Sequence, residues 1–426
     1  MITFDKCKSF KGKINVPSDK SITHRAVIMG AMADGVTVVR NPLLSRDTIA
    51  TMNAVQQLGV NIVNERSRLL IHSEGVKNFK EPYDVINCDN SGTTARLMMG
   101  VLSPCNFYSV LTGDPSLLRR PMARVIKPLS VLGADIRSKD NNKYLPATIL
   151  PADMKAGEII AEVKSAQVKS SVLLAGVQLE GITTYVEKTP TRDHTERMLK
   201  AFGIKCENNQ GRISVTGGDL VQAKIDVPAD FSSAAFYIGA GLIFEGSEIV
   251  IENCGLNPSR IGLLTVLKEL GVDIKYEITN DEYEPIGNIY VTPAQIKGGK
   301  VGGDIIANMI DEIPVLAMIG LFGQAPLEIR DAKELRVKES DRIAALINNF
   351  KALGAEIEEY EDGLKIYPLI KEPEKATLLA YDDHRISMIN IILAKKFGVK
   401  VLLDNIASLD VSYPEFIGDL LSLEEK

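Results

Sequence analysis

Two short segments combine cationic and polar side chains at a spacing that suits the binding of an anion. In the segment PSDKSITHR, Lys20 and Arg25 lie near the start of an expected helix, where backbone N–H groups and a guanidinium fork can hold a phosphate or a carboxylate. In the segment KESDR, an i,i+4 helical spacing would place Lys338 and Arg342 on one face. On local composition alone, a capped helix with surface cations explains the first segment better, and a solvated helix face explains the second.

The elements that must position these residues repeat along the chain. An amphipathic helix that ends on Leu-Gly or Phe-Gly recurs five times, and a short alternating stretch that predicts a half-buried strand follows it, as at 134–136 and 355–357. The glycines fall at the C′ position, where a left-handed backbone is common: Gly59, Gly133, Gly203, Gly271 and Gly354. A second pattern, a polar cap followed by a uniformly apolar run, recurs six times, with starts near Ser18, Asn90, Ser165, Asp230, Asp311 and Asp382.

Six copies of one unit predict an α/β fold with two similar domains of three repeats each. Helices that are apolar on all sides, such as Val172–Val177, Val315–Leu321 and Ile386–Ala394, must lie inside their domain with outer helices around them. The last copy lacks its Leu-Gly and should end in an abbreviated helix around Phe416–Leu423. Several starts of the buried helices carry cations and, if aimed at one cleft, would bind anions there: Lys20, Arg96, Lys169 and Arg385.

Composition excludes several classes of function. The 426 residues carry a net charge of -6, which argues against a nucleic-acid-binding surface. The five cysteines occur singly without CxxC spacing and the four histidines lack HExxH spacing, so we expect neither a disulfide framework nor a protein-held metal. The start has no apolar signal region and no apolar run approaches the roughly 18 residues of a membrane span, which predicts a cytoplasmic protein.

Further segments follow PSDKSITHR in a fixed order through nearly the whole chain. They are Asn90–Thr94, Arg119–Met122, Ser165–Ser170, Arg192–Glu196, Ile310–Pro314, Leu335–Arg342 and Asp383–Arg385. Together they resemble the enolpyruvyl transferases, specifically the EPSP synthase (3-phosphoshikimate 1-carboxyvinyltransferase) family. Most of these segments are weak signals alone, but their shared order is highly specific.

The resemblance implies a fold of two domains, each with three βαβαββ repeats whose buried helices are surrounded by outer helices and sheets. It implies that the N-terminal strand joins the C-terminal domain, so that residues 1–18 plus 227–426 form one domain and 19–226 the other, with the active site in the cleft between them. The implied protein is a monomer that transfers the enolpyruvyl group of phosphoenolpyruvate to the 5-hydroxyl of shikimate 3-phosphate in chorismate and aromatic amino-acid biosynthesis. It needs no metal or covalent cofactor, and glyphosate inhibits the family.

The resemblance also implies the site residues. Shikimate 3-phosphate would contact Lys20, Ser21, Arg25, Ser165, Ala166, Gln167, Arg192, Asp311 and Lys338. Phosphoenolpyruvate would contact Lys20, Gly92, Arg120, Gln167, Arg342 and Arg385. Asp311 would accept the hydroxyl proton, and Glu339 with Lys20 would handle the proton at the methylene carbon. Asp311 could also be the cap of the helix that contains Pro314.

The chain departs from parts of the family, and other functions stay open. Ala166 stands where some members have a second serine, so a phosphate contact there must come from a backbone N–H, and Val411 stands where another branch has an active-site lysine. The nearest alternative is UDP-N-acetylglucosamine enolpyruvyl transferase, which normally has a reactive cysteine in the loop that here spans 113–120 and contains none. RNA 3′-phosphate cyclase would need a histidine nucleophile and a basic path, and a non-catalytic anion-binding protein is a further alternative.

Overall fold

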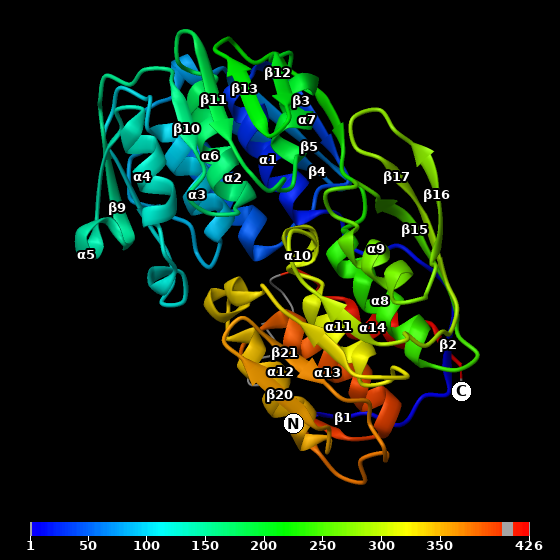
Figure 1. The fold of residues 1–426 in the computed structure, drawn as a ribbon. Coiled ribbons are helices and arrows are strands. Elements are labelled where there is room, and N and C mark those ends of the chain that lie inside the picture. The colour runs from blue at the N-terminus through cyan, green and yellow to red at the C-terminus, as the bar shows by residue number, and fades with distance from the viewer. Residues whose placement is uncertain (1, 403–411, 426) are drawn as a thin grey trace. The chain divides into compact units, whose positions relative to one another are not determined.

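The computed structural model describes residues 2–402 and 412–425, and the chain forms two compact units (Figure 1). The central unit is Ser18–Val227, and the terminal unit combines Met1–Pro17 with Pro228–Lys426. Both are built from the same α/β repeat, which confirms the predicted fold class.

The central unit contains three four-stranded sheets with one shared order: a parallel pair of strands, then two antiparallel neighbours. The first sheet is β14 (Lys224–Asp226), β3 (Asp34–Arg40), β5 (Arg68–Glu74) and β4 (Asn61–Glu65). The second is β6 (Ile86–Asn87), β7 (Ser109–Thr112), β9 (Tyr144–Leu150) and β8 (Asp135–Ser138). The third is β10 (Glu158–Ile160), β11 (Ile182–Val186), β13 (Arg212–Thr216) and β12 (Cys206–Asn209).

Each of these sheets is accompanied by a buried and an outer helix. The buried helices are α1 (Lys20–Met32), α3 (Gly92–Leu102) and α6 (Ala166–Gly176), and the outer ones are α2 (Arg46–Gln57), α4 (Ala123–Val131) and α7 (His194–Ala201). Short helical turns are η1 (Val76–Asn78), η2 (Leu117–Arg119) and α5 (Lys139–Asn142). Helices α3 and α6 approach so closely that a Cβ on Gly100 would lie 2.1 Å from the Ser171 carbonyl oxygen, so only glycine fits there.

The terminal unit repeats this sheet order, with a shortened last copy. Its first sheet is β2 (Ser9–Ile14), β15 (Glu248–Gly255), β17 (Ile286–Val291) and β16 (Lys275–Asn280), with β24 (Glu424–Glu425) added beside β2. The second is β18 (Gly299–Val301), β19 (Leu327–Ile329), β21 (Gly363–Ile366) and β20 (Ile357–Tyr360). The third is β22 (Thr377–Leu379), β23 (Lys400–Leu402) and β1 (Ile2–Thr3). Its buried helices are α8 (Phe231–Ile243), α11 (Ile313–Gly320) and α13 (His384–Phe397). The other helices are α9 (Gly262–Glu269), α10 (Ile305–Met309), η3 (Lys333–Val337), α12 (Arg342–Ala352) and α14 (Phe416–Ser422).

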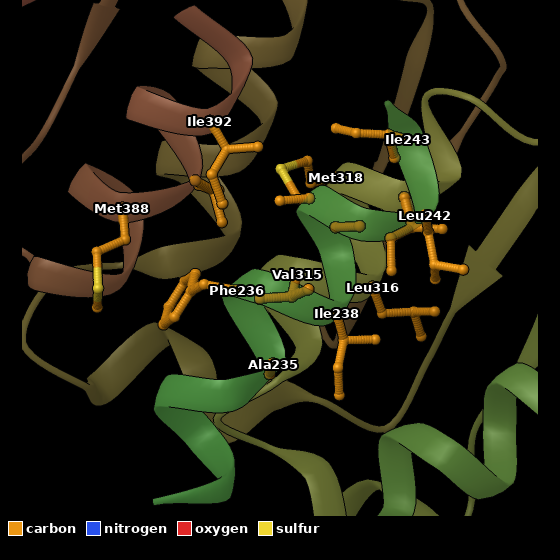
Figure 2. Close-up of a cluster of buried hydrophobic side chains, with 14 of the residues drawn as sticks. Ala235, Phe236, Ile238, Leu242, Ile243, Val315, Leu316, Met318, Met388 and Ile392 are labelled. Atoms are coloured by element: carbon orange, nitrogen blue, oxygen red, sulfur yellow. The ribbon is translucent and has the colours of Figure 1, made fainter. Parts of the chain in front are cut away.

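The core of the terminal unit forms where its three buried helices meet (Figure 2). Phe236 from α8, Val315 and Met318 from α11, and Met388 and Ile392 from α13 are all at most 1 % exposed. Because these helices are surrounded by protein, their side chains are apolar on every face rather than along one stripe. The predicted interior position of such helices is therefore confirmed.

Two strands are exchanged between the repeats that open each unit. Strand β2 precedes α1 in the chain but pairs in parallel with β15 of the terminal unit. Strand β14 precedes α8 but pairs in parallel with β3 of the central unit. The chain therefore passes from one unit to the other twice, between Pro17 and Ser18 and between Val227 and Pro228.

The boundaries predicted from caps are confirmed. The five predicted C′ glycines all have positive φ, between 81° and 104°: Gly59, Gly133, Gly203, Gly271 and Gly354. The six buried helices begin directly after Asp19, Ser91, Ser165, Asp230, Glu312 and Asp383, each within one or two residues of its predicted start. The abbreviated last helix is α14.

Candidate active site

The starts of three helices in the terminal unit bring oppositely charged side chains together around Arg342. This residue opens α12 and is 1 % exposed. Its guanidinium contacts three carboxylates: Nε lies 2.8 Å from Asp383 Oδ2, Nη2 lies 2.7 Å from Glu339 Oε2, and Nη1 lies 3.4 Å from Asp311 Oδ1. Burial alone would lower the pKa of Arg342, but Asp383, Glu339 and Asp311 together raise it above its ordinary value.

Asp311 lies among three cations of this cluster. Besides the Arg342 contact, Lys338 Nζ is 3.6 Å and Arg385 Nε is 4.0 Å from Asp311 Oδ1. Arg385 Nη1 also donates a hydrogen bond to the Asp311 carbonyl oxygen at 3.2 Å. The expectation that Asp311 could cap the helix is wrong, because α11 begins one residue later and its N-cap is Glu312.

The segment Lys338–Arg342 does not form the predicted helical face. Residues 338–340 form a bend between η3 and α12. The Asp341 side chain accepts the Ala344 N–H at 3.0 Å and thereby caps α12, so the helix begins only at Arg342. Lys338 and Arg342 are therefore not one turn apart on the same helix. Lys338 and Arg342 nevertheless share a partner, since both reach the Asp311 carboxylate.

The central unit holds a second group of cations at the start of α1. Lys20 Nζ lies 3.1 Å from Asp47 Oδ2, which the second residue of α2 contributes. Arg25 is 3 % exposed, and Nε and Nη2 donate to the hydroxyls of Thr195 and Ser170, each at 2.8 Å. Arg25 Nη1 also donates to the carbonyl of Ser21, at 2.9 Å, so neutral oxygens fix the guanidinium in place.

A third group lies where α3 and α6 begin. Gly92 is the first residue of α3, and a Cβ built on it would lie 3.3 Å from Arg96 Nη1 and 3.5 Å from Arg120 Nη1. Arg96 Nη1 donates to Gln167 Oε1, while Gln167 Nε2 donates to the Thr93 hydroxyl at 2.9 Å.

The remaining predicted residues of the central unit lie at helix starts or in the loop that leads to one. Arg120 Nη2 donates to Asn90 Oδ1 at 2.6 Å. Ser165 caps α6 by accepting the Val168 N–H, and Ala166 is the first residue of that helix. Arg192 is half-buried in the loop before α7.

Several polar residues of these groups were not predicted. Asp47, Asn90 and Thr195 lie in the central unit and Asp383 in the terminal unit. Asn90, Thr195 and Asp383 occur inside the motif segments, so they could have been found there. Nothing local distinguishes Asp47 from other acidic first-turn residues.

One cation that the sequence placed at a ligand-facing helix start faces the interior instead. Lys169 is fully buried on α6, and Nζ lies 2.9 Å from Glu187 Oε1 and 2.7 Å from Glu196 Oε1. Its charge is balanced inside the unit, because a buried ammonium needs a paired carboxylate. Val411, where another branch has a lysine, lies outside the described residues.

Four of the cysteines are buried, free thiols. Cys88, Cys105, Cys206 and Cys254 are buried, and burial raises the pKa of the Cys105 thiol to about 12. Within residues 2–402 and 412–425, no group of three or more His, Cys, Asp or Glu side chains has an arrangement that could hold a metal ion. None of the helices in that part of the chain is both long and apolar enough to cross a membrane.

Known structures define the class of protein. The enolpyruvyl transferase NikO from Streptomyces tendae superimposes with a TM-score of 0.78 over 98 % of this chain and 96 % of its own, at 14 % identity, which shows a shared fold alone. EPSP synthase from Acinetobacter baumannii matches with a TM-score of 0.87 and 36 % identity over 99 % of this chain and 97 % of its own. The fold is thus that of the enolpyruvyl transferases.

Sequence relatives give the particular family. The family model described as EPSP synthase (3-phosphoshikimate 1-carboxyvinyltransferase) matches residues 4–420. Proteins named 3-phosphoshikimate 1-carboxyvinyltransferase from Bacillus pumilus and Bacillus subtilis are 43 % and 40 % identical, over 95 % and 99 % of both chains respectively. The chain belongs to the EPSP synthase family.

Proposed function

We propose that the protein transfers the enolpyruvyl group of phosphoenolpyruvate to the 5-hydroxyl of shikimate 3-phosphate and releases phosphate. As a member of the EPSP synthase family it is a 3-phosphoshikimate 1-carboxyvinyltransferase, an enzyme of aromatic amino-acid biosynthesis. The observation that carries the proposal is the family match over residues 4–420, which contains every predicted site residue. Both substrates are small anions, which suits the cationic groups at the helix starts.

The acceptor phosphate fits the groups at α1 and α6. Arg25 is held rigidly by Ser170 and Thr195, so its fork is oriented before a ligand arrives. The proposed acceptor contacts are those predicted above: Lys20, Ser21, Arg25, Ser165, Ala166, Gln167, Arg192, Asp311 and Lys338.

The proposed donor contacts are the group around Gly92 and, as the family resemblance implies, two arginines of the terminal unit. Because Gly92 has no side chain, the start of α3 leaves room for an anion beside the guanidiniums of Arg96 and Arg120. The proposed phosphoenolpyruvate contacts are Lys20, Gly92, Arg120, Gln167, Arg342 and Arg385. Three guanidiniums suit a ligand with both a phosphate and a carboxylate, since each can be held by paired N–H groups.

The proposed chemistry is an addition followed by an elimination. The acceptor hydroxyl oxygen bonds to the enol carbon of phosphoenolpyruvate while Asp311 takes the hydroxyl proton and the methylene carbon receives a proton from Glu339, assisted by Lys20. The bond to the phosphate oxygen then breaks, the methyl carbon returns a proton to Glu339, the double bond re-forms, and the departing phosphate takes up the hydroxyl proton from Asp311. The three cations around Asp311 stabilise its ionised form, which can accept a proton. No step requires a metal or a covalent cofactor.

The covalent alternative finds no support in the cysteines. A UDP-N-acetylglucosamine enolpyruvyl transferase would use a reactive thiol near Arg120, but residues 113–120 contain none. Cys105 is buried, and burial raises its pKa to about 12, which disfavours the thiolate needed for reaction. We further propose that the enzyme acts as a cytoplasmic monomer.

A phosphate-release assay tests the proposal. Purified protein should release phosphate from phosphoenolpyruvate only when shikimate 3-phosphate is present, and mass spectrometry should detect the enolpyruvyl product. Free shikimate and UDP-N-acetylglucosamine serve as control acceptors and should be inactive. Turnover with the UDP-sugar would favour the alternative transferase, and binding of both substrates without phosphate release would favour a non-catalytic protein.

A further inference from the structure

A buried charged network lies directly behind the loop that carries Arg192. Lys169 on α6 is fully buried, and Glu187, at the end of β11, is 6 % exposed. Glu196 on α7 completes the network at 5 % exposure. Burial alone would lower the pKa of Lys169, but Glu196 and Glu187 outweigh it and keep the ammonium charged.

This network holds Thr191 at three points. Lys169 Nζ donates to the Thr191 carbonyl oxygen at 3.2 Å. Glu187 Oε1 accepts the Thr191 N–H at 3.2 Å, and Glu187 Oε2 accepts the Thr191 hydroxyl at 2.7 Å. Both backbone groups and the side chain of the residue before Arg192 are therefore fixed by two charged, buried partners.

The same lysine connects this loop to the first turn of α6. Lys169 follows Ser165, Ala166 and Gln167 within one helical turn, so a rigid link joins that turn to the loop. On the other side of the loop, the Thr195 hydroxyl contacts Ser170 at 2.6 Å and accepts from Arg25. Parts of the chain far apart in sequence are thus locked to one another behind the proposed acceptor site.

We infer that Lys169 and Glu187 are positioning residues that set the place of Arg192 relative to the start of α6, and thereby the affinity for the phosphate of the acceptor. The inference rests on the proposed function. A buried ammonium paired with two buried carboxylates contributes little net stability to a fold, since the desolvation of the three charges offsets much of their electrostatic attraction. The network can instead hold the loop at a fixed distance from α6 through hydrogen bonds to both backbone groups of Thr191. Apolar side chains at the same positions could not form these hydrogen bonds.

The first test replaces Lys169 by methionine, which keeps length but removes the charge and the donor. Lys169→Met should raise KM for shikimate 3-phosphate by roughly ten- to a hundredfold, as expected for a misplaced binding group, and leave KM for phosphoenolpyruvate within about threefold. Glu187→Gln, which keeps the side-chain length and one acceptor oxygen but removes the charge, should give a smaller shift in the same direction and serves if Lys169→Met does not fold. Lys395→Met is the matched control: Lys395 is a buried lysine, 3 % exposed and paired with Glu424 at 2.8 Å, near the far end of α13 from Arg385.

A double-mutant cycle separates positioning from general destabilisation. If Lys169 acts through Arg192, the combined variant Lys169→Met with Arg192→Ala should have the KM for shikimate 3-phosphate of Arg192→Ala alone. Additive losses, or an unchanged KM in Lys169→Met, would overturn the inference. Lys395→Met should alter thermal stability without changing either KM.

A readout that does not depend on turnover keeps this inference distinct from the proposed function. Lys188 is exposed, and limited trypsin digestion can report how often the loop opens for cleavage after Lys188 or Arg192. Cleavage there should accelerate at least about fivefold in Lys169→Met relative to wild type, and not in Lys395→Met. Faster cleavage in a protein without transferase activity would refute the function but not the anchoring, whereas normal activity with unchanged cleavage and KM would refute the anchoring alone.

Discussion

Replacement of Gly92 by alanine probes the proposed donor site at one atom. The added Cβ would lie 3.3 Å from Arg96 Nη1 and 3.5 Å from Arg120 Nη1, so at least one guanidinium must move by a few tenths of an ångström. Neither moves without cost, because Arg96 donates to Gln167 and Arg120 Nη2 donates to Asn90 at 2.6 Å. Overpacking of this kind costs about 1–3 kcal/mol, so we expect KM for phosphoenolpyruvate to rise by roughly five- to a hundredfold.

Glyphosate should be affected more than the substrate. This inhibitor of the family is an extended molecule that would occupy the phosphoenolpyruvate position, and a Cβ beside the guanidiniums shortens the space available to it. Since discrimination is a difference between two binding free energies, the inhibition constant should rise by a larger factor than KM. Steady-state kinetics with varied phosphoenolpyruvate and glyphosate measures both constants on the two proteins.

A matched glycine provides the control for this experiment. Gly418 lies inside α14, and a Cβ built on it has no atom within 4 Å, so Gly418→Ala should leave both constants unchanged. Equal losses of substrate and inhibitor in Gly92→Ala would show that the new methyl group does not discriminate between them. Unchanged constants would show that neither ligand approaches the start of α3, and would refute the donor site.

Four further variants test the chemistry and the charge network. Asp311→Asn and Glu339→Gln preserve shape but remove a proton carrier, so kcat should fall by roughly a hundredfold or more while shikimate 3-phosphate still binds by calorimetry; near-normal turnover would remove that residue from the mechanism. Arg342→Met leaves the fully buried Asp383 without its arginine partner and should lower the free energy of unfolding by about 3–5 kcal/mol at pH 7. Burial raises the pKa of Asp383, but Arg342 outweighs burial and holds this pKa below its ordinary value of 3.8, so the ion pair stabilises the fold above that pH and ceases to do so as the pH falls further. Urea unfolding at pH 7 and in acid should therefore show that the stability deficit of Arg342→Met shrinks in acid, and a constant deficit would contradict this. Cys105→Ser should be nearly silent in kcat and in both KM values, whereas loss of activity would revive a covalent mechanism.

The sequence predicts the repeat architecture well because the relevant signals are local. A C′ glycine terminates a helix through its own φ, as Gly59 and Gly354 do at 91° and 85°, whatever lies around it. A helix with apolar residues on every face has to be interior, and α11 is completely buried. Neither conclusion needs knowledge of a distant residue.

Local signals fail where a distant partner decides the outcome. Lys20 and Lys169 look alike in sequence, as cations in the first turn of a buried helix. Lys20, however, is half-buried at the start of α1 beside Asp47, whereas Lys169 is fully buried and paired with Glu187. The partners lie 27 and 18 residues away in the chain. The helical face expected at Lys338 is wrong for a different reason, because the Asp341 side chain caps α12 and the helix begins only at Arg342.

The N-caps of five buried helices differ in charge, although the helices occupy the same place in the repeat. Aspartates cap α1, α8 and α13, and each side-chain carboxylate accepts a backbone N–H of the first turn. Serines cap α3 and α6. A carboxylate at the N-cap satisfies the positive end of the helix with a negative charge, whereas a hydroxyl satisfies one donor and leaves the field of the helix uncompensated.

This difference gives α3 and α6 a capacity for anions that the repeat as a whole does not have. Their first residues are Gly92 and Ala166, which leave the N–H groups of the first turn open to close approach. The two helices pack in direct contact at Gly100, and Gln167 of α6 is hydrogen-bonded to Arg96 and Thr93 of α3 near the two starts. A second serine at position 166 is therefore not required to bind a phosphate there, because the backbone of a neutrally capped helix already supplies the donors and the field.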